Sequence, residues 1–170
     1  SAFYLFFTTV RNFFSKGLQD IQQNIAHFGF SLLILSILFN NILSSEIIAN
    51  LKVGEEFHSK KNSIFFEKIE KNINSNFNSI VGHFKIKDNE GNEIYLTPEL
   101  RIYNQPVTIT SEASIKTNLI EDKFIVMNII KDTDYFNVRY QVKPFMIWIW
   151  FSALLLSISG LLSLIKKYEK

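Results

Sequence analysis

Residues 21–45 read IQQNIAHFGFSLLILSILFNNILSS and contain no Asp, Glu, Lys or Arg. A helix needs about 20 predominantly apolar residues to cross the hydrocarbon core of a bilayer, so this stretch predicts a transmembrane helix over 21–45. A second uncharged stretch, FMIWIWFSALLLSISGLLSLI, occupies residues 145–165. It predicts another transmembrane helix over 144–166, which Pro144 can open because a proline needs no hydrogen-bond partner there.

The apolar run at the start of the chain, residues 2–10, is too short to span a bilayer and ends at Arg11. No basic residue precedes it, so it lacks the pattern of a signal peptide. We interpret residues 1–20 as the end of a preceding transmembrane helix followed by a cytoplasmic connector. This interpretation makes the chain part of a longer protein or one product of a split gene.

The polar chain between the two apolar stretches, residues 46–143, predicts one small domain. It carries 13 Lys and Arg against 14 Asp and Glu, and it has no basic stripe. These features argue against a nucleic acid as a partner. The chain has no cysteine, which excludes disulfides, thiol redox chemistry and thiolate metal sites within it.

Alternation of apolar and polar residues predicts short strands in this domain. Six segments carry the pattern: 47–53, 63–69, 80–87, 94–96, 124–130 and 136–143. Turn signals join the last four into two hairpins, whereas residues 112–119 fit a helical turn and residues 72–78 a loop. So many short strands in so small a domain predict an antiparallel barrel or sandwich.

The predicted fold class is therefore a membrane α+β protein. Two transmembrane helices flank a small extracytoplasmic β-domain over 46–143, and the tail of a truncated third helix stands at the N-terminus. Five basic residues lie beyond the helix ends on the side of the two termini, and five lie beyond the opposite ends, on the side of the domain. Their number alone therefore does not decide the orientation. The dense basic tail decides for a cytoplasmic C-terminus over 167–170, because positive charge favours the cytoplasmic side.

His27 is the only ionisable side chain in residues 21–45. An ionisable residue inside a membrane is costly unless it is satisfied, so it is a functional candidate that needs a proton, a hydrogen-bond acceptor or a metal. Ala26 and Gly29 are small enough to let another helix or a macrocycle approach, and Phe28 and Phe30 add aromatic surface. The alternative is a histidine that hydrogen-bonds across a helix interface or lies at headgroup level.

Trp148 and Trp150 fall near the start of the second predicted transmembrane helix. Tryptophan prefers the membrane interface, where its ring is buried and its N–H stays hydrated. These residues therefore predict an aromatic belt, and the alternative is a site for a flat ligand above the membrane.

The polar domain offers further candidates of weaker kind. His83 shares a predicted strand face with lysines and is expected to be solvated, and His58 is expected in a loop. Arg101, Arg139 and Lys143 are expected to make ion pairs inside the domain rather than to bind an anionic group of a ligand or partner.

Residues 137–150, NVRYQVKPFMIWIW, resemble the C-terminus of the CcmF family. Members of this family are cytochrome c-type biogenesis proteins that act as heme lyases. Two further segments resemble family motifs in the same order: AHFGF at residues 26–30, and RIY, QPVT and EA within residues 101–113. The resemblance covers the chain from about Asn24 to Lys167.

The resemblance implies that His27 is an axial ligand to the iron of a b-type heme held within the helices. A neutral imidazole is a good ligand for heme iron. The family's other ligand histidines lie in a part that this sequence lacks, so the second ligand must come from the missing N-terminal part or a split subunit. The chain is then part of a heme lyase and inactive alone, with its catalytic residues unassigned.

The same resemblance implies a set of partners and a location. The partners are the rest of the heme lyase, the heme chaperone CcmE, a CcmH-like subunit and apocytochrome c, with a quinol as electron source. The location is the bacterial or mitochondrial inner membrane, with the β-domain in the periplasm or intermembrane space.

Two other hypotheses remain open. One is a non-catalytic membrane scaffold whose β-domain docks partners while His27 only packs helices. The other is an unrelated transporter or secretion accessory with an outward domain.

Overall fold

The computed structural model describes residues 2–15, 21–59, 62–88 and 91–168. The chain divides into two compact units. The helical unit comprises residues 1–44, 118–122 and 143–170, and the β unit comprises residues 45–117 and 123–142.

The helical unit contains α1 (Ala2–Ser15), α2 (Ile21–Leu43) and α3 (Met146–Tyr168). Of the helices described, Ile21–Leu43 and Met146–Lys166 are long and apolar enough to cross a membrane. α1 covers the short apolar run at the start of the chain, and its interpretation as the end of a longer transmembrane helix stays a prediction.

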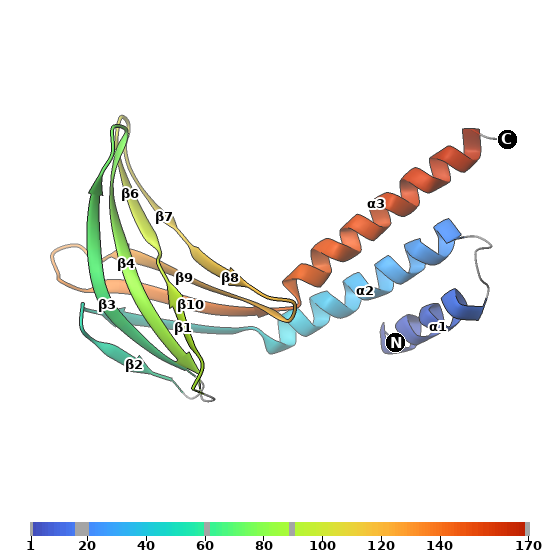
Figure 1. The fold of residues 1–170 in the computed structure, drawn as a ribbon, viewed down its shortest axis with the longest axis horizontal. Coiled ribbons are helices and arrows are strands. Elements are labelled where there is room, and N and C mark those ends of the chain that lie inside the picture. Colours follow the sequence, from blue (N-terminus) through green and yellow to red (C-terminus); the bar gives the residue numbers. More distant parts are fainter. Residues whose placement is uncertain (1, 16–20, 60–61, 89–90, 169–170) are drawn as a thin grey trace. The chain divides into compact units, whose positions relative to one another are not determined.

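Helices α2 and α3 lie side by side (Figure 1). They are antiparallel, because the hydroxyl of Ser159 donates to the carbonyl of Gln22 at 2.6 Å near one end. Near the other end, the side-chain amide of Asn40 donates to the carbonyl of Pro144 at 2.7 Å. The pair therefore forms a hairpin of helices with polar contacts at both ends.

Small residues bring α2 and α3 close together. A Cβ added at Gly29 would lie 3.2 Å from Leu155 Cβ and 3.3 Å from the carbonyl oxygen of Ser152. Ser152 and Ser159 are buried, and the Ser152 hydroxyl donates to the Trp148 carbonyl of its own helix at 2.6 Å. Close backbone approach over glycine and serine is a common means of packing helices in a membrane.

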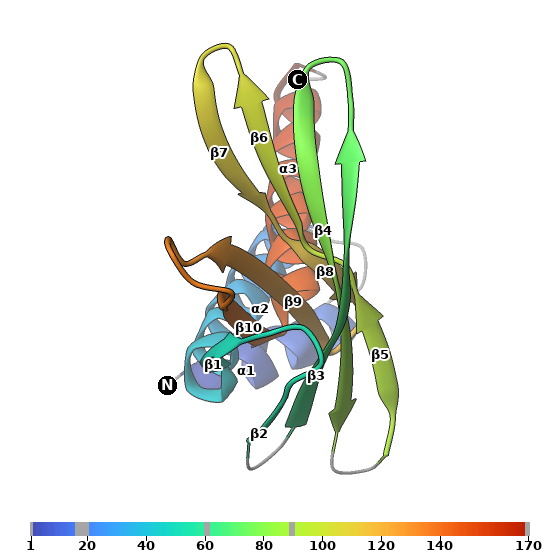
Figure 2. The ribbon, with the colours of Figure 1, turned by 90° about the vertical axis from the view of Figure 1, so that its left-hand side faces the viewer.

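Ten strands occur among the described residues. They are β1 (Ser45–Leu51), β2 (Glu56–His58), β3 (Asn62–Ile73), β4 (Phe77–Asp88), β5 (Glu93–Leu96), β6 (Glu99–Asn104), β7 (Val107–Glu112), β8 (Ser114–Thr117), β9 (Glu121–Ile129) and β10 (Phe136–Pro144). One sheet has the order β1-β10-β9-β8, and the other has the order β2-β3-β4-β6-β7, with β5 paired to β4 (Figure 2).

The core of the β unit lies between these two sheets. Phe66 on β3 and Phe84 on β4 are fully buried, and their rings stack at 4.3 Å between centroids. Met127 on β9 and Tyr140 on β10 belong to the same buried cluster from the other sheet. The β unit is therefore a sandwich, and the predicted class of two apolar helices flanking an antiparallel β-domain is confirmed.

The predicted helical turn over 112–119 is wrong. β7 ends at Glu112 and β8 begins at Ser114, so the chain passes from one sheet to the other at this point. The alternation of apolar and polar side chains is interrupted where the chain passes from one sheet to the other. The apolar residues of this short stretch are then spaced as they would be in a helix. The predicted loop over 72–78 is shorter in the structure, since only residues 74–76 separate β3 from β4.

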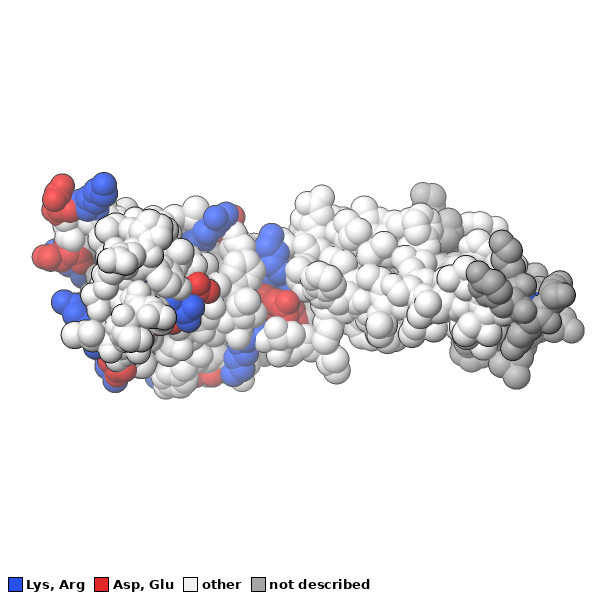
Figure 3. Space-filling model, turned by 90° about the horizontal axis from the view of Figure 1, so that it is seen from above, with Lys and Arg blue, Asp and Glu red and all other residues white. Residues whose placement is uncertain are grey.

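Charged side chains are concentrated on the β unit. On the face shown in Figure 3, Lys, Arg, Asp and Glu are spread over the β unit, and the described helical surface is nearly free of them. The helices therefore present an apolar surface suited to hydrocarbon, and the sandwich presents one suited to water.

Candidate functional site

His27 lies near the start of α2, and its side chain is exposed. Residues three and four apart share a helix face, which places the exposed side chains of Gln23 and Phe30 on the same side. Ile34 and Ile37 continue this side toward the other end of the helix. We call these five residues the His27 face. It points away from the contact between Gly29 and α3.

The imidazole of His27 is available to a ligand. The side-chain nitrogen of Gln23 lies 3.5 Å from His27 Nε2, at the outer limit of a hydrogen bond. No stronger hydrogen bond of the ring occurs among the residues described. The exposed imidazole on this uncharged helix face is therefore open to a partner, such as a metal ion or a hydrogen-bonding group.

The structure separates the roles of the residues beside His27. Gly29 lets another helix, α3, approach closely, as expected, and this contact leaves no room there for a macrocycle. Phe28 turns toward α1, where its ring lies 5.8 Å from that of Phe6. Phe30 is exposed beside His27, so it is the aromatic residue of this group that a ligand on the His27 face could contact.

The helical unit holds no histidine besides His27. No group of three or more His, Asp or Glu that could hold a metal ion occurs among them. The other two histidines of the chain, His58 and His83, both belong to the β unit. A second histidine ligand to an iron at His27 would therefore come from outside the helical unit.

An apolar cavity of about 360 Å³ lies where α1 meets α2 and α3. Six phenylalanines contribute to its lining: Phe3, Phe6, Phe7, Phe28, Phe39 and Phe145. Among the described residues that line it, His27 is absent and no side chain is ionisable. Its chemistry suits hydrocarbon and offers no group for catalysis.

The two tryptophans of α3 differ in their surroundings. Trp148 Nε1 donates a hydrogen bond to the carbonyl oxygen of Leu119 at 2.8 Å. Trp148, Leu119, Ile147 and Phe151 line a small apolar hollow of about 200 Å³. Trp150 is exposed. Trp148 thus holds the turn between β8 and β9 against α3, a role that its position in the sequence did not reveal.

Both other histidines lie beside carboxylates. His83 Nε2 is 3.4 Å from Glu70 Oε2, and its side chain is only 24 % exposed. The expectation that His83 is solvated is therefore only partly met, although it does lie on the outer face of β4 with Lys85. His58 lies at the end of the short strand β2 rather than in the expected loop, and its Nε2 is 3.8 Å from Glu56 Oε2 on the same strand.

The arginines of the β unit make ion pairs as expected. Arg101 contacts Glu99 on its own strand β6 at 2.9 Å and Glu112 on the adjacent strand β7 at 3.6 Å. Arg139 pairs with Glu46 on the neighbouring strand β1. Each of these arginines thus has an internal partner, which supports surface pairing rather than an open anion site.

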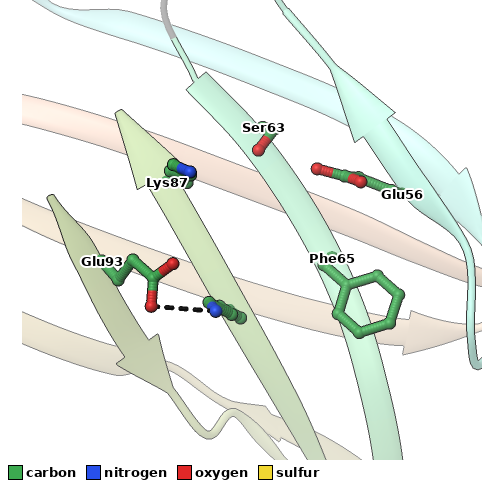
Figure 4. A pocket seen from close by; sticks show the side chains of 6 residues that line it. Glu56, Ser63, Phe65, Lys87 and Glu93 are labelled. Atoms are coloured by element: carbon green, nitrogen blue, oxygen red, sulfur yellow. Dashed lines mark ion pairs between the residues drawn. The ribbon is translucent and has the colours of Figure 1, made fainter. Parts of the chain in front are cut away.

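A shallow hollow of about 270 Å³ lies on the outer face of the six-stranded sheet (Figure 4). Lys85 and Glu93 form an ion pair of 2.8 Å in its wall. The hydrogen bond from Lys85 lowers the pKa of Glu93, and the bond to Glu93 raises the pKa of Lys85. Glu56 and Lys87 add one charge of each sign. The hollow is therefore electrically balanced, and it has the character of a solvated surface network.

Comparison with known proteins identifies the family. The family described as the CcmF C-terminal beta-sandwich matches residues 42–144, which is more than half of the chain. The cytochrome c-type biogenesis protein CcmF of Pseudomonas fluorescens is 29% identical over 153 residues, covering 87% of this chain and 23% of that protein. Its counterpart in Escherichia coli is 26% identical over 146 residues, covering 85% of this chain and 23% of that protein.

A solved structure has the same fold. The cytochrome c heme lyase CcmF superposes with a TM-score of 0.65 at 17% identity, covering 83% of this chain and 24% of that chain. The chain spans about a quarter of the length of these relatives. Its sequence and its sandwich between two apolar helices agree in one assignment: the chain belongs to the CcmF family and corresponds to its C-terminal part.

Proposed function

We propose that the chain is the C-terminal portion of a membrane heme lyase for c-type cytochrome maturation, in which His27 provides one axial ligand to a b-type heme. The observation that carries this proposal is the exposed imidazole of His27 on an otherwise uncharged helix face. Relatives named as cytochrome c-type biogenesis proteins support the process, and a relative named as a cytochrome c heme lyase supports the cofactor.

The residues of the His27 face have separate tasks in this proposal. His27 would hold the iron through Nε2, which Gln23 approaches only at 3.5 Å. Phe30 and Ile34 would offer apolar surface to the macrocycle. When bound, a b-type heme supplies one-electron transfer. With a cytoplasmic C-terminus, His27 lies in the cytoplasmic half of the bilayer, because α2 then enters from that side.

The exposure of His27 shows that it does not pack α2 against α1 or α3 among the described residues. The scaffold hypothesis needs His27 to pack α2 against another helix. Among the described residues, the contacts of α2 with α1 and α3 are made by other residues, including Phe28 and Gly29. An imidazole left exposed in a membrane helix needs a partner from outside.

The β unit is the proposed platform for heme attachment to apocytochrome c. Its charged, water-suited surface supports a location in the periplasm or the intermembrane space, beside the inner membrane. The proposed partners are the remaining part of the heme lyase, the heme chaperone CcmE, a CcmH-like subunit and apocytochrome c, with a quinol as the source of electrons. The catalytic residues remain unassigned.

The test is replacement of His27 by alanine in the assembled protein. Reduced-minus-oxidised spectra should lose the b-heme absorption, because one axial ligand is gone. His58→Ala and His83→Ala serve as matched controls and should retain it. Ile34→Ala tests the same helix face without removing an imidazole. Full b-heme absorption in His27→Ala, at an equal amount of assembled protein, would contradict the proposal.

A further inference from the structure

The turn between β8 and β9 carries two apolar side chains at its tip. Leu119 and Ile120 are 68% and 65% exposed. Hairpin tips are usually polar, because they lie in water and favour Gly, Asn, Asp and Ser. The turn belongs to the helical unit, although the strands that it joins lie in the β unit. We call residues 118–122 the apolar tip.

The apolar tip is closed by its own polar residue. The side-chain oxygen of Asn118 accepts hydrogen bonds from the backbone N–H groups of Ile120 at 2.8 Å and Glu121 at 2.7 Å. The N–H of Asn118 donates to the carbonyl of Glu121 at 3.1 Å. Asparagine commonly closes turns in this way. The turn therefore does not need the side chains of Leu119 and Ile120 to hold its shape.

Two hydrogen bonds fasten the apolar tip to the start of α3. The backbone N–H of Phe145 donates to the carbonyl of Ile120 at 2.7 Å. The indole N–H of Trp148 donates to the carbonyl of Leu119 at 2.8 Å. Since Trp148 stands in the first turn of α3, the tip is held beside the end of that helix, where an interfacial tryptophan is expected.

The space between the tip and the helix is apolar. Leu119, Ile147, Trp148 and Phe151 line a hollow of about 200 Å³, and the rings of Trp148 and Phe151 meet edge to face at 6.0 Å. Exposed apolar patches that continue from one element to the next mark interaction sites. This patch is continuous with the apolar surface of α3, so the same surroundings that cover α3 cover the tip.

We propose that Leu119 and Ile120 form a membrane-interface anchor, with their side chains among the lipid acyl chains of the leaflet where α3 begins. The anchor rests on the proposed membrane crossing of α3. Its partner is lipid hydrocarbon rather than an anionic headgroup. Glu121 and Asp122 end the apolar tip, and Lys116 and Lys123 flank it, so the two negative and two positive charges balance.

The experiment uses single cysteines in the assembled protein, reconstituted in phosphatidylcholine vesicles. The chain has no cysteine of its own, so each variant carries one labelled position in it. Leu119→Cys probes the tip, Leu154→Cys probes the exposed side of α3, and Val107→Cys probes an exposed apolar side chain of the β unit. An environment-sensitive fluorophore is attached to each, and protein without an added cysteine gives the background.

Lipids that carry a quencher at a shallow or a deep position along the acyl chain then report the depth of each fluorophore in the bilayer. At Leu119→Cys we expect a blue-shifted emission that the shallow quencher reduces. At Leu154 we expect loss to the deep quencher, and at Val107 loss to neither. Trp148→Phe keeps the aromatic ring and removes the indole N–H, so it should reduce the quenching at Leu119 and leave that at Leu154 unchanged.

Three outcomes would overturn the anchor. If Leu154 is quenched and Leu119 is not, α3 is in the membrane and the tip is in water or is covered by another protein segment. If Val107 is quenched as strongly as Leu119, the signal reflects unspecific adsorption of apolar side chains. If Leu154 is not quenched, the membrane crossing of α3 is wrong, and the anchor is lost with it.

Discussion

The side-chain amide of Asn40 donates a hydrogen bond to the carbonyl oxygen of Pro144 at 2.7 Å, which links the last turn of α2 to the end of β10. The next residue, Phe145, has a φ of 61°, so the chain turns sharply before α3 begins. Positive φ is uncommon outside glycine and needs support from its surroundings. The Phe145 ring, 5.3 Å from that of Phe39, and the Asn40 amide provide that support from α2.

Replacing Asn40 should therefore weaken the helical unit. Asn40→Leu leaves the Pro144 carbonyl without this partner, and we expect a loss of about 1–2 kcal/mol in the free energy of unfolding. Thermal unfolding of the purified protein in detergent would measure it. Asn41→Leu is the matched control, because Asn41 is exposed and makes no side-chain hydrogen bond within the described residues. Equal midpoints for both variants would contradict the prediction.

The contact at Gly29 allows a second matched pair of substitutions. Gly29→Ala places a methyl group 3.3 Å from a backbone oxygen of α3, and a backbone atom cannot move aside as a flexible side chain can. We expect a cost of about 1–3 kcal/mol in stability as α2 and α3 separate. Gly160→Ala meets no atom within 4 Å and should stabilise α3 slightly, by about 0.5–1 kcal/mol. A lower unfolding midpoint for Gly160→Ala than for Gly29→Ala would refute this account.

The stacked rings of Phe66 and Phe84 are the centre of the β unit's core. Phe84→Ala should reduce the free energy of unfolding of the β unit by about 3–5 kcal/mol, because it leaves a cavity between the sheets. Hydrogen exchange of the strand amides would measure this loss in the β unit. Ile73→Ala removes an apolar side chain that is 87% exposed and should change the stability by less than about 0.5 kcal/mol. Unchanged exchange in Phe84→Ala would argue against a packed core.

The β unit should lose stability in acid. The hydrogen bonds from Lys68 to Glu70 and from Lys85 to Glu93 lower the pKa of each carboxyl from its ordinary value of 4.5. A carboxyl with a lower pKa in the folded state stabilises the fold above the unfolded-state pKa, and this contribution is lost as the pH falls through the folded-state value. The unfolding midpoint of the β unit should therefore fall as the pH drops below about 4.5.

Glutamine substitutions test the origin of this acid dependence. Glu93→Gln removes the titrating carboxyl and should flatten the decline. Glu67→Gln is the control, because Glu67 lies at the irregularity between Phe66 and Lys68 and has no ion pair among the described residues. A decline that is equally steep in wild type and Glu93→Gln would show that other groups cause it.

The helices and the longer strands could be predicted from the sequence for a simple physical reason. A run without charge, such as residues 21–45, has few stable environments besides a membrane or a core. The alternation around Phe84 reports one buried and one wet face of a strand. The uncharged run and the alternation depend only on residues that are close in the sequence, so both can be recognised before the fold is known.

Other features were missed or depend on contacts between distant residues. β7 was missed although Val107 and Ile109 alternate with threonines as in a strand, and both side chains are exposed. At the candidate site, the ionisable His27 was evident from its uncharged surroundings. The packing of Gly29 against α3 joins residues far apart in the sequence, and so does the hydrogen bond from Trp148 to the Leu119 carbonyl. Neither contact can be read from the sequence alone.

The first and last strands of the β unit are neighbours, with Ser45 opposite Val142 in the pairing of β1 with β10. The β unit is therefore an inserted domain whose first and last residues lie close together. A short linker between residues 44 and 143 should therefore replace the whole sandwich and leave α2 and α3 able to pair.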